Sequence, residues 1–389
     1  MQFRDLKQQY AVLKTDIDRA VIEAVSSGAY IMGGPVQELE RQLAVYTRVR
    51  HCITCASGTD ALRLALKAWG VRQGDAVFVP DFTFFATAEA VSSEGATPVF
   101  VDVDCETFNI DPADLENKIE TTVRKGVLIP KVIIAVDLFG LPADYAAVRR
   151  IADNYGLLVL EDGAQGFGGC ANGKRSCSFG DISTTSFFPA KPLGCYGDGG
   201  ACFTDNDEWA ELMDSYRMHG KGSSKYENVR IGMNSRLDTI QASILKVKLK
   251  AFDEELAAVN KAAEEYTIRL RDVVETPVVP AGFESSWAQY TLRLHNKTER
   301  DGLQSYLRSK GIPSMVYYPL PLHQQAAYRN YGLSGADCPV ACKLCETVLS
   351  LPMHPYISAE EICMVCNTIK TFLKRERGKA SKSKQDIAR

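Results

Sequence analysis

The feature that most constrains this chain is an alternation of short β-branched segments with helical patterns between residue 57 and about residue 250. The apolar segments lie at residues 76–79, 98–103, 132–137, 157–162 and 201–204. Continuous apolar strands that alternate with helices are typical of a mostly parallel sheet whose two faces are both covered. The sequence therefore predicts an α/β domain.

A second, smaller unit follows this domain. A helical pattern runs from residue 235 to about residue 270, and the strand-like residues 290–294 are followed by two more helical patterns. These patterns predict a smaller C-terminal α/β domain, across which the first segment, up to Gly28, packs. We therefore divide the chain into three parts. These are residues 1–250 (the N-terminal segment and large domain), residues 251–375 (the small domain) and residues 376–389 (a flexible basic tail).

Composition narrows the range of functions. Lys plus Arg number 45 against 48 for Asp plus Glu, and the resulting net charge of -3 predicts no attraction to nucleic acid or to an anionic membrane. No stretch approaches ~18 consecutive apolar residues, and charges stand where a secretory signal needs an apolar run. Twelve scattered cysteines suit reduced thiols, so we expect a cytoplasmic protein.

Four of these cysteines have the spacing of a zinc site. The pairs Cys342/Cys345 and Cys363/Cys366 are separated by 17 residues, as in four-cysteine zinc sites. Both pairs lie in helical patterns without a nearby glycine, and cysteines three apart on a helix share one face. The sequence favours buried thiols over zinc, and we expect no metal site.

A helix start near residue 57 is suited to bind a phosphate group. Ser57, Gly58 and Thr59 open a helical pattern, so free N–H groups and two hydroxyls meet at the positive end of a helix. The alternative is an ordinary N-cap, which needs only Ser57 or Thr59. The P-loop, dinucleotide-binding, nucleophile-elbow and His-Glu-x-x-His signatures are absent from the sequence.

Lys191 lies in an unusual loop. It stands between Pro189 and Pro192 among apolar residues, and four glycines follow within residues 194–200. Apolar surroundings lower the pKa of a lysine and make its neutral amine a nucleophile toward an aldehyde; the alternative is a surface lysine in a turn. Asp162 ends the strand-like segment 157–162, where an acidic residue faces a ligand cation, caps a helix or forms an ion pair.

Together these three features match one cofactor. Pyridoxal phosphate has an aldehyde, a pyridine nitrogen and a phosphate, and Lys191, Asp162 and the helix start at Ser57 offer one partner for each. Each feature is common by itself, whereas their combination is specific. The sequence therefore predicts a pyridoxal-phosphate enzyme.

Four motifs carry a resemblance to a known family. They are Ser-Gly-Thr-Asp-Ala at 57–61, Glu-Asp-Gly-Ala-Gln at 161–165, Ser-Phe-Phe-Pro-Ala-Lys-Pro-Leu-Gly at 186–194 and Gly-Met-Asn-Ser-Arg-Leu-Asp at 232–238. With these motifs the chain resembles the DegT-type nucleotide-sugar aminotransferases from about residue 3 to residue 372. The resemblance implies an aspartate aminotransferase-like type I fold with a mostly parallel mixed sheet. Residues 187–200 and 351–355 are most similar to family members that aminate C3 of UDP-2-acetamido-2-deoxy-3-oxo-glucuronate.

The resemblance implies a role for each matching residue. Lys191 and Asp162 are the implied catalytic residues: Lys191 binds the cofactor aldehyde and moves a proton, and Asp162 keeps the pyridine nitrogen protonated. The other implied cofactor-binding residues are Gly58, Thr59, Phe84, Gln165, Ser186 and Asn234. Asn234 is expected to reach the phosphate of the neighbouring subunit, which implies a homodimer. The implied substrate-binding residues are Arg236, Tyr317, Tyr318 and His323.

The implied reaction moves an amino group from L-glutamate to the 3-keto carbon of a UDP-linked 2-acetamido-2-deoxy-3-oxo-uronic acid, for polysaccharide or glycan precursor synthesis. Another nucleotide-linked keto sugar (3- or 4-keto) and a catalytically silent binding protein of the same fold stay open as alternatives. A sugar dehydratase of this fold has histidine in place of the lysine, so Lys191 argues against it. Phe84 and the tyrosines could equally be core residues, and Arg236 could bind either the sugar carboxylate or the α-carboxylate of glutamate.

Overall fold

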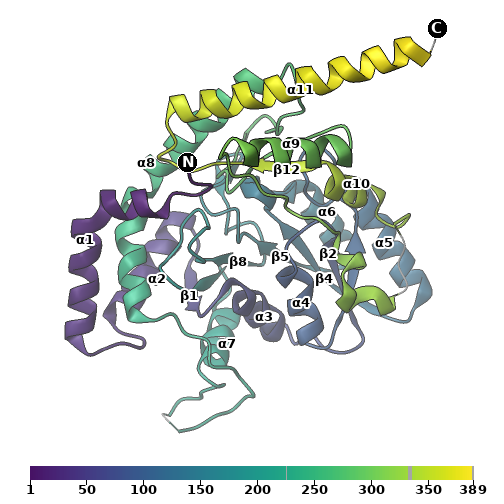
Figure 1. Ribbon diagram of the computed structural model, residues 1–389. Helices are drawn as coiled ribbons and strands as arrows, with labels where there is room; N and C mark the ends of the chain where they lie inside the picture. Colours follow the sequence, from purple (N-terminus) through teal and green to yellow (C-terminus); the bar gives the residue numbers. More distant parts are fainter. Residues whose placement is uncertain (225, 332–334, 388–389) are drawn as a thin grey trace.

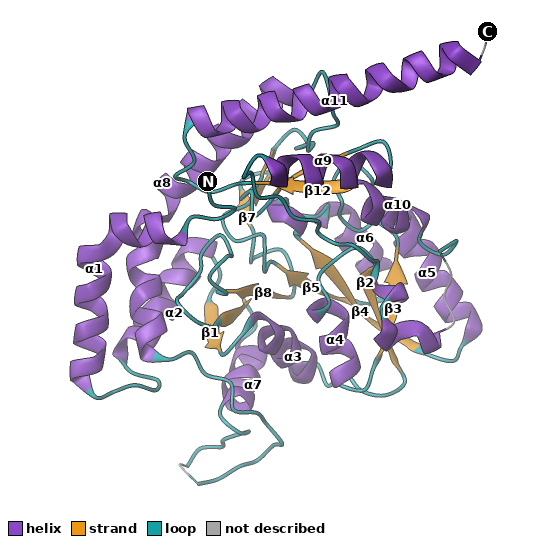
Figure 2. Cartoon of the chain, in the orientation of Figure 1, coloured by secondary structure: helices purple, strands orange, loops and turns teal. Residues whose placement is uncertain are grey.

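The computed structural model describes residues 1–224, 226–331 and 335–387. Its centre is a seven-stranded sheet enclosed by helices, as Figure 1 and Figure 2 show. The strand order is β1 (His51–Cys55), β9 (Gly200–Thr204), β8 (Ile182–Ser186), β5 (Leu158–Asp162), β4 (Ile129–Val136), β2 (Asp75–Pro80), β3 (Thr97–Val101). β9 is antiparallel to both neighbours, and the other strands are mutually parallel. The expected mostly parallel mixed sheet is confirmed.

Both faces of this sheet are buried, which explains the continuous apolar strands. Val77 and Val79 pack on one face with α3 (Gly58–Ala68) and α4 (Ala86–Ser93). Ala76 and Phe78, the alternate residues of the same strand, pack on the other face with α5 (Pro112–Lys125) and α6 (Tyr145–Tyr155). Successive side chains of a strand point to opposite faces, so a sheet covered twice needs apolar residues at every position.

A smaller C-terminal unit has its own apolar core. Its strands β11 (Tyr290–Arg293) and β12 (Val348–Leu351) are antiparallel, and its helices include α9 (Lys297–Ser309), α10 (Pro339–Thr347) and α11 (Ala359–Ile387). The long helix α8 (Thr239–Leu270) joins this core to the large domain. The boundary expected at residue 250 falls inside α8, and the division into domains stays a prediction.

The remaining elements complete the periphery. α1 (Leu6–Ser27) packs along α8, and Gln9 Nε2 of α1 donates to Glu255 at 3.0 Å. The other elements are two helices, three 3-10 turns and a small three-stranded sheet: α2 (Gly34–Thr47), α7 (Asp207–Arg217), the turns Leu138–Gly140, Leu322–Gln324 and Ala326–Tyr331, and the strands β10 (Phe283–Glu284), β6 (Cys170–Ala171) and β7 (Lys174–Arg175).

The basic segment at the C-terminus differs from the expectation of a separate tail. α11 continues as a helix to Ile387, because lysine, arginine, alanine and glutamine are good helix formers even without an apolar stripe. The flexibility expected of residues 376–389 stays a prediction, and residues 388–389 lie outside the described residues. Among the helices that the structure describes, none combines the length and the apolar character needed to cross a bilayer.

All twelve cysteines are free thiols. The four cysteines with zinc-like spacing lie on α10 and α11, and they do not share one environment. Cys345 packs in the core beside the central sheet, whereas Cys366 packs in the core of the small unit. The expectation of buried thiols is confirmed for Cys345 and Cys366, whereas Cys342 and Cys363 are only partly buried.

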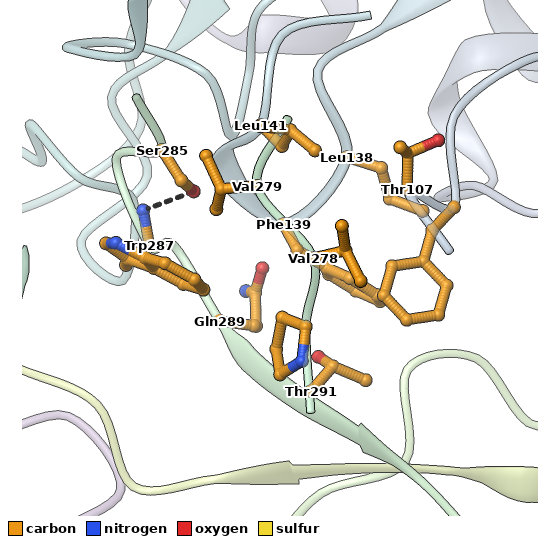
Figure 3. Close-up of a pocket in the computed structure, with 12 residues that line it drawn as sticks. Thr107, Leu138, Phe139, Leu141, Val278, Val279, Ser285, Trp287, Gln289 and Thr291 are labelled. Atoms are coloured by element: carbon orange, nitrogen blue, oxygen red, sulfur yellow. Dashed lines mark hydrogen bonds between the residues drawn. The ribbon is translucent and has the colours of Figure 1, made fainter. Parts of the chain in front are cut away.

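A small cavity of about 20 Å³ lies at the seam between the two units (Figure 3). Leu138 and Phe139 line it from the large domain, and Val278, Trp287 and Gln289 line it from the segment that leads into β11. Gln289 Oε1 is buried there and has no hydrogen-bond partner within the described residues. The space suits a single water molecule, which would satisfy that oxygen, and none of the candidate site residues lines it.

Two buried carboxyl groups, Asp137 and Glu161, connect the sheet to the loop that follows β5. Their side chains lie close enough for each to affect the pKa of the other. Asp137 also accepts from Tyr145 Oη at 2.8 Å and Ser176 Oγ at 2.7 Å. Burial, and then the charge of Glu161, raise the pKa of Asp137 well above its ordinary value. The pair therefore retains a proton that two exposed carboxyl groups would lose.

We expect Asp137→Asn to remove a pH dependence of stability. Because folding raises the pKa of Asp137, the native state binds more protons than the unfolded state above about pH 4. Wild-type stability therefore falls as pH rises from there through the native pKa, by up to about 1.4 kcal/mol per pH unit. Asparagine has nearly the same shape but does not titrate.

Urea unfolding at several values between about pH 5 and pH 8 measures this difference. Relative to wild type, Asp137→Asn should become more stable as pH rises, whereas the exposed control Asp153→Asn should follow the wild-type curve. Parallel curves for Asp137→Asn and wild type would contradict the shared proton.

Candidate active site

The carboxyl ends of four parallel strands bring the candidate residues to one edge of the sheet. Ser57 to Thr59 follow β1, Asp81 to Phe84 follow β2, Asp162 ends β5 and Ser186 ends β8. Ligands of open α/β sheets bind at this edge, because the strand ends and the starts of the following helices meet there.

The turn between β1 and α3 is packed so closely that it requires glycine. A Cβ atom at Gly58 would lie 2.6 Å from Ser186 Cβ, and one at Gly200 would lie 2.4 Å from the backbone oxygen of Ser57. Ser57 is the N-cap, and its hydroxyl accepts from Asp60 N at 3.1 Å. The first N–H groups of a helix have no partner inside it, so those of Gly58 and Thr59 are available to an anion beside Ser186.

Lys191 and Asp162 form the electrostatic centre of the site. Asp162 is buried; its carboxylate accepts from Thr87 Oγ1 at 2.9 Å and from Ala164 N at 3.2 Å. Burial raises the pKa of Asp162, while Thr87, Ala164 and the charge of Lys191 oppose the rise. Burial lowers the pKa of Lys191, which Asp162 partly offsets. Within the described part of the chain, the Lys191 amine donates to no hydrogen-bond acceptor, so it is available to react.

The structure brings together a cofactor candidate and a substrate candidate. Gln165 is buried; its Oε1 accepts from Phe139 N at 2.6 Å and its Nε2 donates to Tyr318 Oη at 3.0 Å. Phe84 lies beside Tyr318, with 6.2 Å between ring centroids, and is 55% exposed. Phe84 is therefore not a core residue, and its ring is accessible at the strand ends.

His323 is held by a carboxylate. Its Nδ1 lies 2.6 Å from Asp81 Oδ2, and its backbone N–H donates to Asp81 Oδ1 at 2.9 Å. Hydrogen bonding to Asp81 raises the pKa of His323, and its Nε2 is buried without a partner among the described residues. The Cys338 thiol lies close enough for the three groups to hold a metal ion, but the Asp81 carboxylate is already used by His323. The expectation that there is no metal stays a prediction.

Three further candidates lie at the margins of this arrangement. Tyr317 is half-buried and packs against Phe3, with 6.2 Å between ring centroids. Asn234 is exposed and Arg236 is half-buried, and neither side chain has a hydrogen-bond or ion-pair partner in residues 1–224, 226–331 and 335–387. The Asn234 amide and the Arg236 guanidinium are thus available to a ligand, but neither contacts Lys191.

Two supporting residues, Thr87 and Asp81, are not among the candidates that the sequence predicts. Thr87 donates to Asp162, and Asp81 orients His323. Thr87 lies in the first turn of α4, three residues after the candidate Phe84. The contact between Asp81 and His323 joins positions 242 residues apart, and no local pattern announces it.

We expect Asp81→Asn to lower the pKa of His323, because the variant loses the negative charge that favours the imidazolium form. NMR titration of the histidine rings measures this pKa, and His323→Gln assigns the signal among the five histidines. Glu106→Gln, an exposed charge change in the same domain, should leave the titration unchanged. An unchanged His323 pKa in Asp81→Asn would contradict the pairing.

Comparison with known proteins shows the family of this chain. The model of the DegT/DnrJ/EryC1/StrS aminotransferase family matches residues 12–370. UDP-2-acetamido-2-deoxy-3-oxo-D-glucuronate aminotransferase of Pseudomonas aeruginosa is 45% identical over 367 residues, which cover 94% of this chain and 98% of that protein.

Two solved structures are also similar. A DegT DnrJ EryC1 StrS aminotransferase from Brucella abortus has a TM-score of 0.94 and 47% identity, over 96% of this chain and 99% of that chain. NtdA from Bacillus subtilis, solved with bound cofactor PMP, has a TM-score of 0.84 and 29% identity, over 93% of this chain and 82% of that chain. Because the family model spans most of the chain and a relative is 45% identical over 94% of it, this chain belongs to the DegT/DnrJ/EryC1/StrS aminotransferase family.

Proposed function

We propose that this protein is a pyridoxal-phosphate-dependent aminotransferase that transfers an amino group from L-glutamate to the 3-keto carbon of a UDP-linked 2-acetamido-2-deoxy-3-oxo-uronic acid. The observation that carries the proposal is the unpartnered amine of Lys191 beside buried Asp162, at the edge where the parallel strands end. The 45% identical relative from Pseudomonas aeruginosa, which is named for this acceptor, supports the choice of sugar.

The residues present fit the cofactor. Burial raises the pKa of Asp162, so this carboxylate lacks a full counter-charge, and a protonated pyridine nitrogen would supply one. The glycine-lined start of α3 at Gly58, with Thr59 and Ser186, is suited to the phosphate group. Phe84 has a ring face open for stacking, and Gln165 keeps one amide hydrogen beyond its bond to Tyr318.

The chain's own residues perform the proton chemistry. Bound pyridoxal phosphate supplies an aldehyde carbon and a ring that accepts the electron pair left on a substrate carbon. Lys191 takes and returns the proton of that carbon, because burial lowers the pKa of its amine and makes the neutral form accessible. Asp162 holds the proton on the ring nitrogen, and Thr87 fixes the orientation of the carboxylate.

The acceptor requires further contacts. A uronate carboxylate that leaves water needs a charge-assisted partner, and Arg236 has a guanidinium without another partner in the described residues. Tyr317, Tyr318 and His323 complete the proposed substrate side. The product would serve polysaccharide or glycan precursor synthesis. The twelve free cysteines are compatible with work in the reducing cytoplasm.

Lys191→Ala should lower the turnover rate by about 10³-fold or more, because the variant loses both the covalent attachment of the cofactor and the proton transfer. The assay combines the purified protein with L-glutamate and a panel of UDP- and dTDP-linked keto sugars, and mass spectrometry detects the aminated sugar. Lys250→Ala, an exposed lysine on α8, is the matched control and should keep wild-type activity.

The panel also tests the acceptor. Wild type should prefer the UDP-linked 3-oxo-uronate over the matching neutral 3-oxo sugar and over 4-keto sugars. Equal rates with acidic and neutral acceptors would overturn the uronate assignment. Transamination retained by Lys191→Ala, or no amino transfer by wild type to any acceptor, would overturn the proposed reaction itself.

The proposal includes a homodimer with shared sites. The segment between α7 and α8 projects from the body of the subunit, as Figure 1 shows, and Val229 and Ile231 in it are 52% and 90% exposed. Apolar side chains this exposed on a projecting segment favour burial against a partner. Asn234 follows in the same segment with its amide unpartnered among the described residues, which supports a contact with the partner's cofactor phosphate.

A mixture of Lys191→Ala and Asn234→Ala proteins should regain activity after subunit exchange. In a mixed dimer, the subunit that keeps Lys191 receives an intact Asn234 from its partner, so one functional site is restored. Native mass spectrometry verifies the exchange, and each variant incubated alone is the control. Absence of a gain after verified exchange, or a monomer by light scattering, would remove the shared-site proposal.

A further inference from the structure

The N-terminal segment contacts the loop that carries Lys191. Phe3 O accepts from Met353 N at 3.1 Å, which attaches the segment to the small unit, and the Phe3 ring packs on Tyr317. The next residue, Arg4, donates from Nη2 to the backbone oxygen of Lys191 at 2.9 Å. Residues at the start of the chain are thus placed beside the reactive lysine.

Arg4 is a half-buried cation without a direct counter-ion. No carboxylate in the described part of the chain forms an ion pair with it, and the hydrogen bond to Lys191 uses one of its five N–H groups. Burial lowers the pKa of Arg4 to about 10, and the charge of Glu255 opposes the shift. The Glu255 carboxylate itself accepts from Gln9 and Tyr356.

Two more cations lie near Arg4. Burial lowers the pKa of Lys191, and the charge of Arg4 lowers it further. Lys248, whose pKa burial lowers to about 8, donates to Gly194 O at 2.6 Å and is also affected by Arg4. The acidic groups that face these three cations are Asp162 and Glu255. The local excess of positive charge favours an anionic ligand.

We infer that Arg4 is a specificity-determining residue that binds a substrate carboxylate beside Lys191. A guanidinium is a planar fork whose remaining N–H groups match the two oxygens of a carboxylate, while the bond to Lys191 O fixes its orientation. The inference rests on the proposed function, in which two ligands bring carboxylates: the amino donor and the uronate sugar. Either carboxylate would bind the Arg4 guanidinium through the same charge-assisted hydrogen bonds.

Binding measurements on the cofactor-loaded enzyme test this inference without turnover. Calorimetry compares wild type, Arg4→Gln, Arg4→Lys and the control Lys7→Gln, an exposed charge change three residues further along. The probes are glutarate, which has the carboxylates of glutamate without its amine, UDP-2-acetamido-2-deoxy-glucuronate, which has no keto group, and neutral UDP-N-acetylglucosamine.

Arg4→Gln should raise the Kd of one acidic probe by about tenfold or more, with a smaller rise for Arg4→Lys and none for Lys7→Gln. A rise confined to the UDP-uronate assigns Arg4 to the acceptor, and a rise confined to glutarate assigns it to the donor. The Kd of UDP-N-acetylglucosamine should not change in either case.

Two results would overturn the inference: unchanged affinity for both acidic probes, or an equal loss for the neutral sugar nucleotide, which would indicate a disturbed loop. The electrostatic effect of Arg4 on Lys191 can be measured separately from ligand binding. Removal of the Arg4 charge should raise the pKa of the Lys191 amine, which competitive labelling of the cofactor-free protein measures. Failure of amino transfer in wild type would overturn the proposed function, whereas the Kd comparison would still decide the role of Arg4.

Discussion

The attraction between the Lys191 amine and the Asp162 carboxylate depends on the removal of both groups from water. Burial moves the pKa of the lysine down and the pKa of the aspartate up, so each group is poised closer to neutrality than on a protein surface. The sheet creates this environment, because parallel strands end at a common edge and the helices that follow enclose it. The order and direction of the strands therefore already place the candidate site at this edge of the sheet.

A second layer of buried acids makes the edge rigid. Asp137 and Glu161 fasten the loop after β5, which carries Gln165, and Asp81 fastens His323 behind the loop that carries Phe84. Each of these carboxyl groups is satisfied by several donors, which offsets the desolvation cost of burying it. The candidate binding residues Gln165 and His323 are thus held by other buried residues, and precise placement of reactive atoms requires such support.

Much of this site could be predicted because its signals are local. Strand ends, the glycines around Lys191 and the polar helix start at Ser57 are each visible within a few residues, and the resemblance to a family joined them. The contact from Arg4 to Lys191 spans 187 residues and involves no recognisable pattern, so only the folded chain displays it. The continuation of α11 to Ile387 has a different cause: helix propensity stabilises a helix even where the sequence has no apolar periodicity that would predict one.

The continuous helix α8 has a mechanical consequence. At 1.5 Å per residue its 32 residues extend about 48 Å. Leu245 and Phe252 are anchored in a core of the large domain, whereas Val259 and Tyr266 are anchored in the core of the small unit. A rotation of one unit relative to the other must bend α8 or turn about its axis, because α8 is a continuous helix where it passes from one core to the other. A single continuous helix thus joins the two cores, so unfolding of α8 on one side would remove helical support from the residues that it contributes to the other.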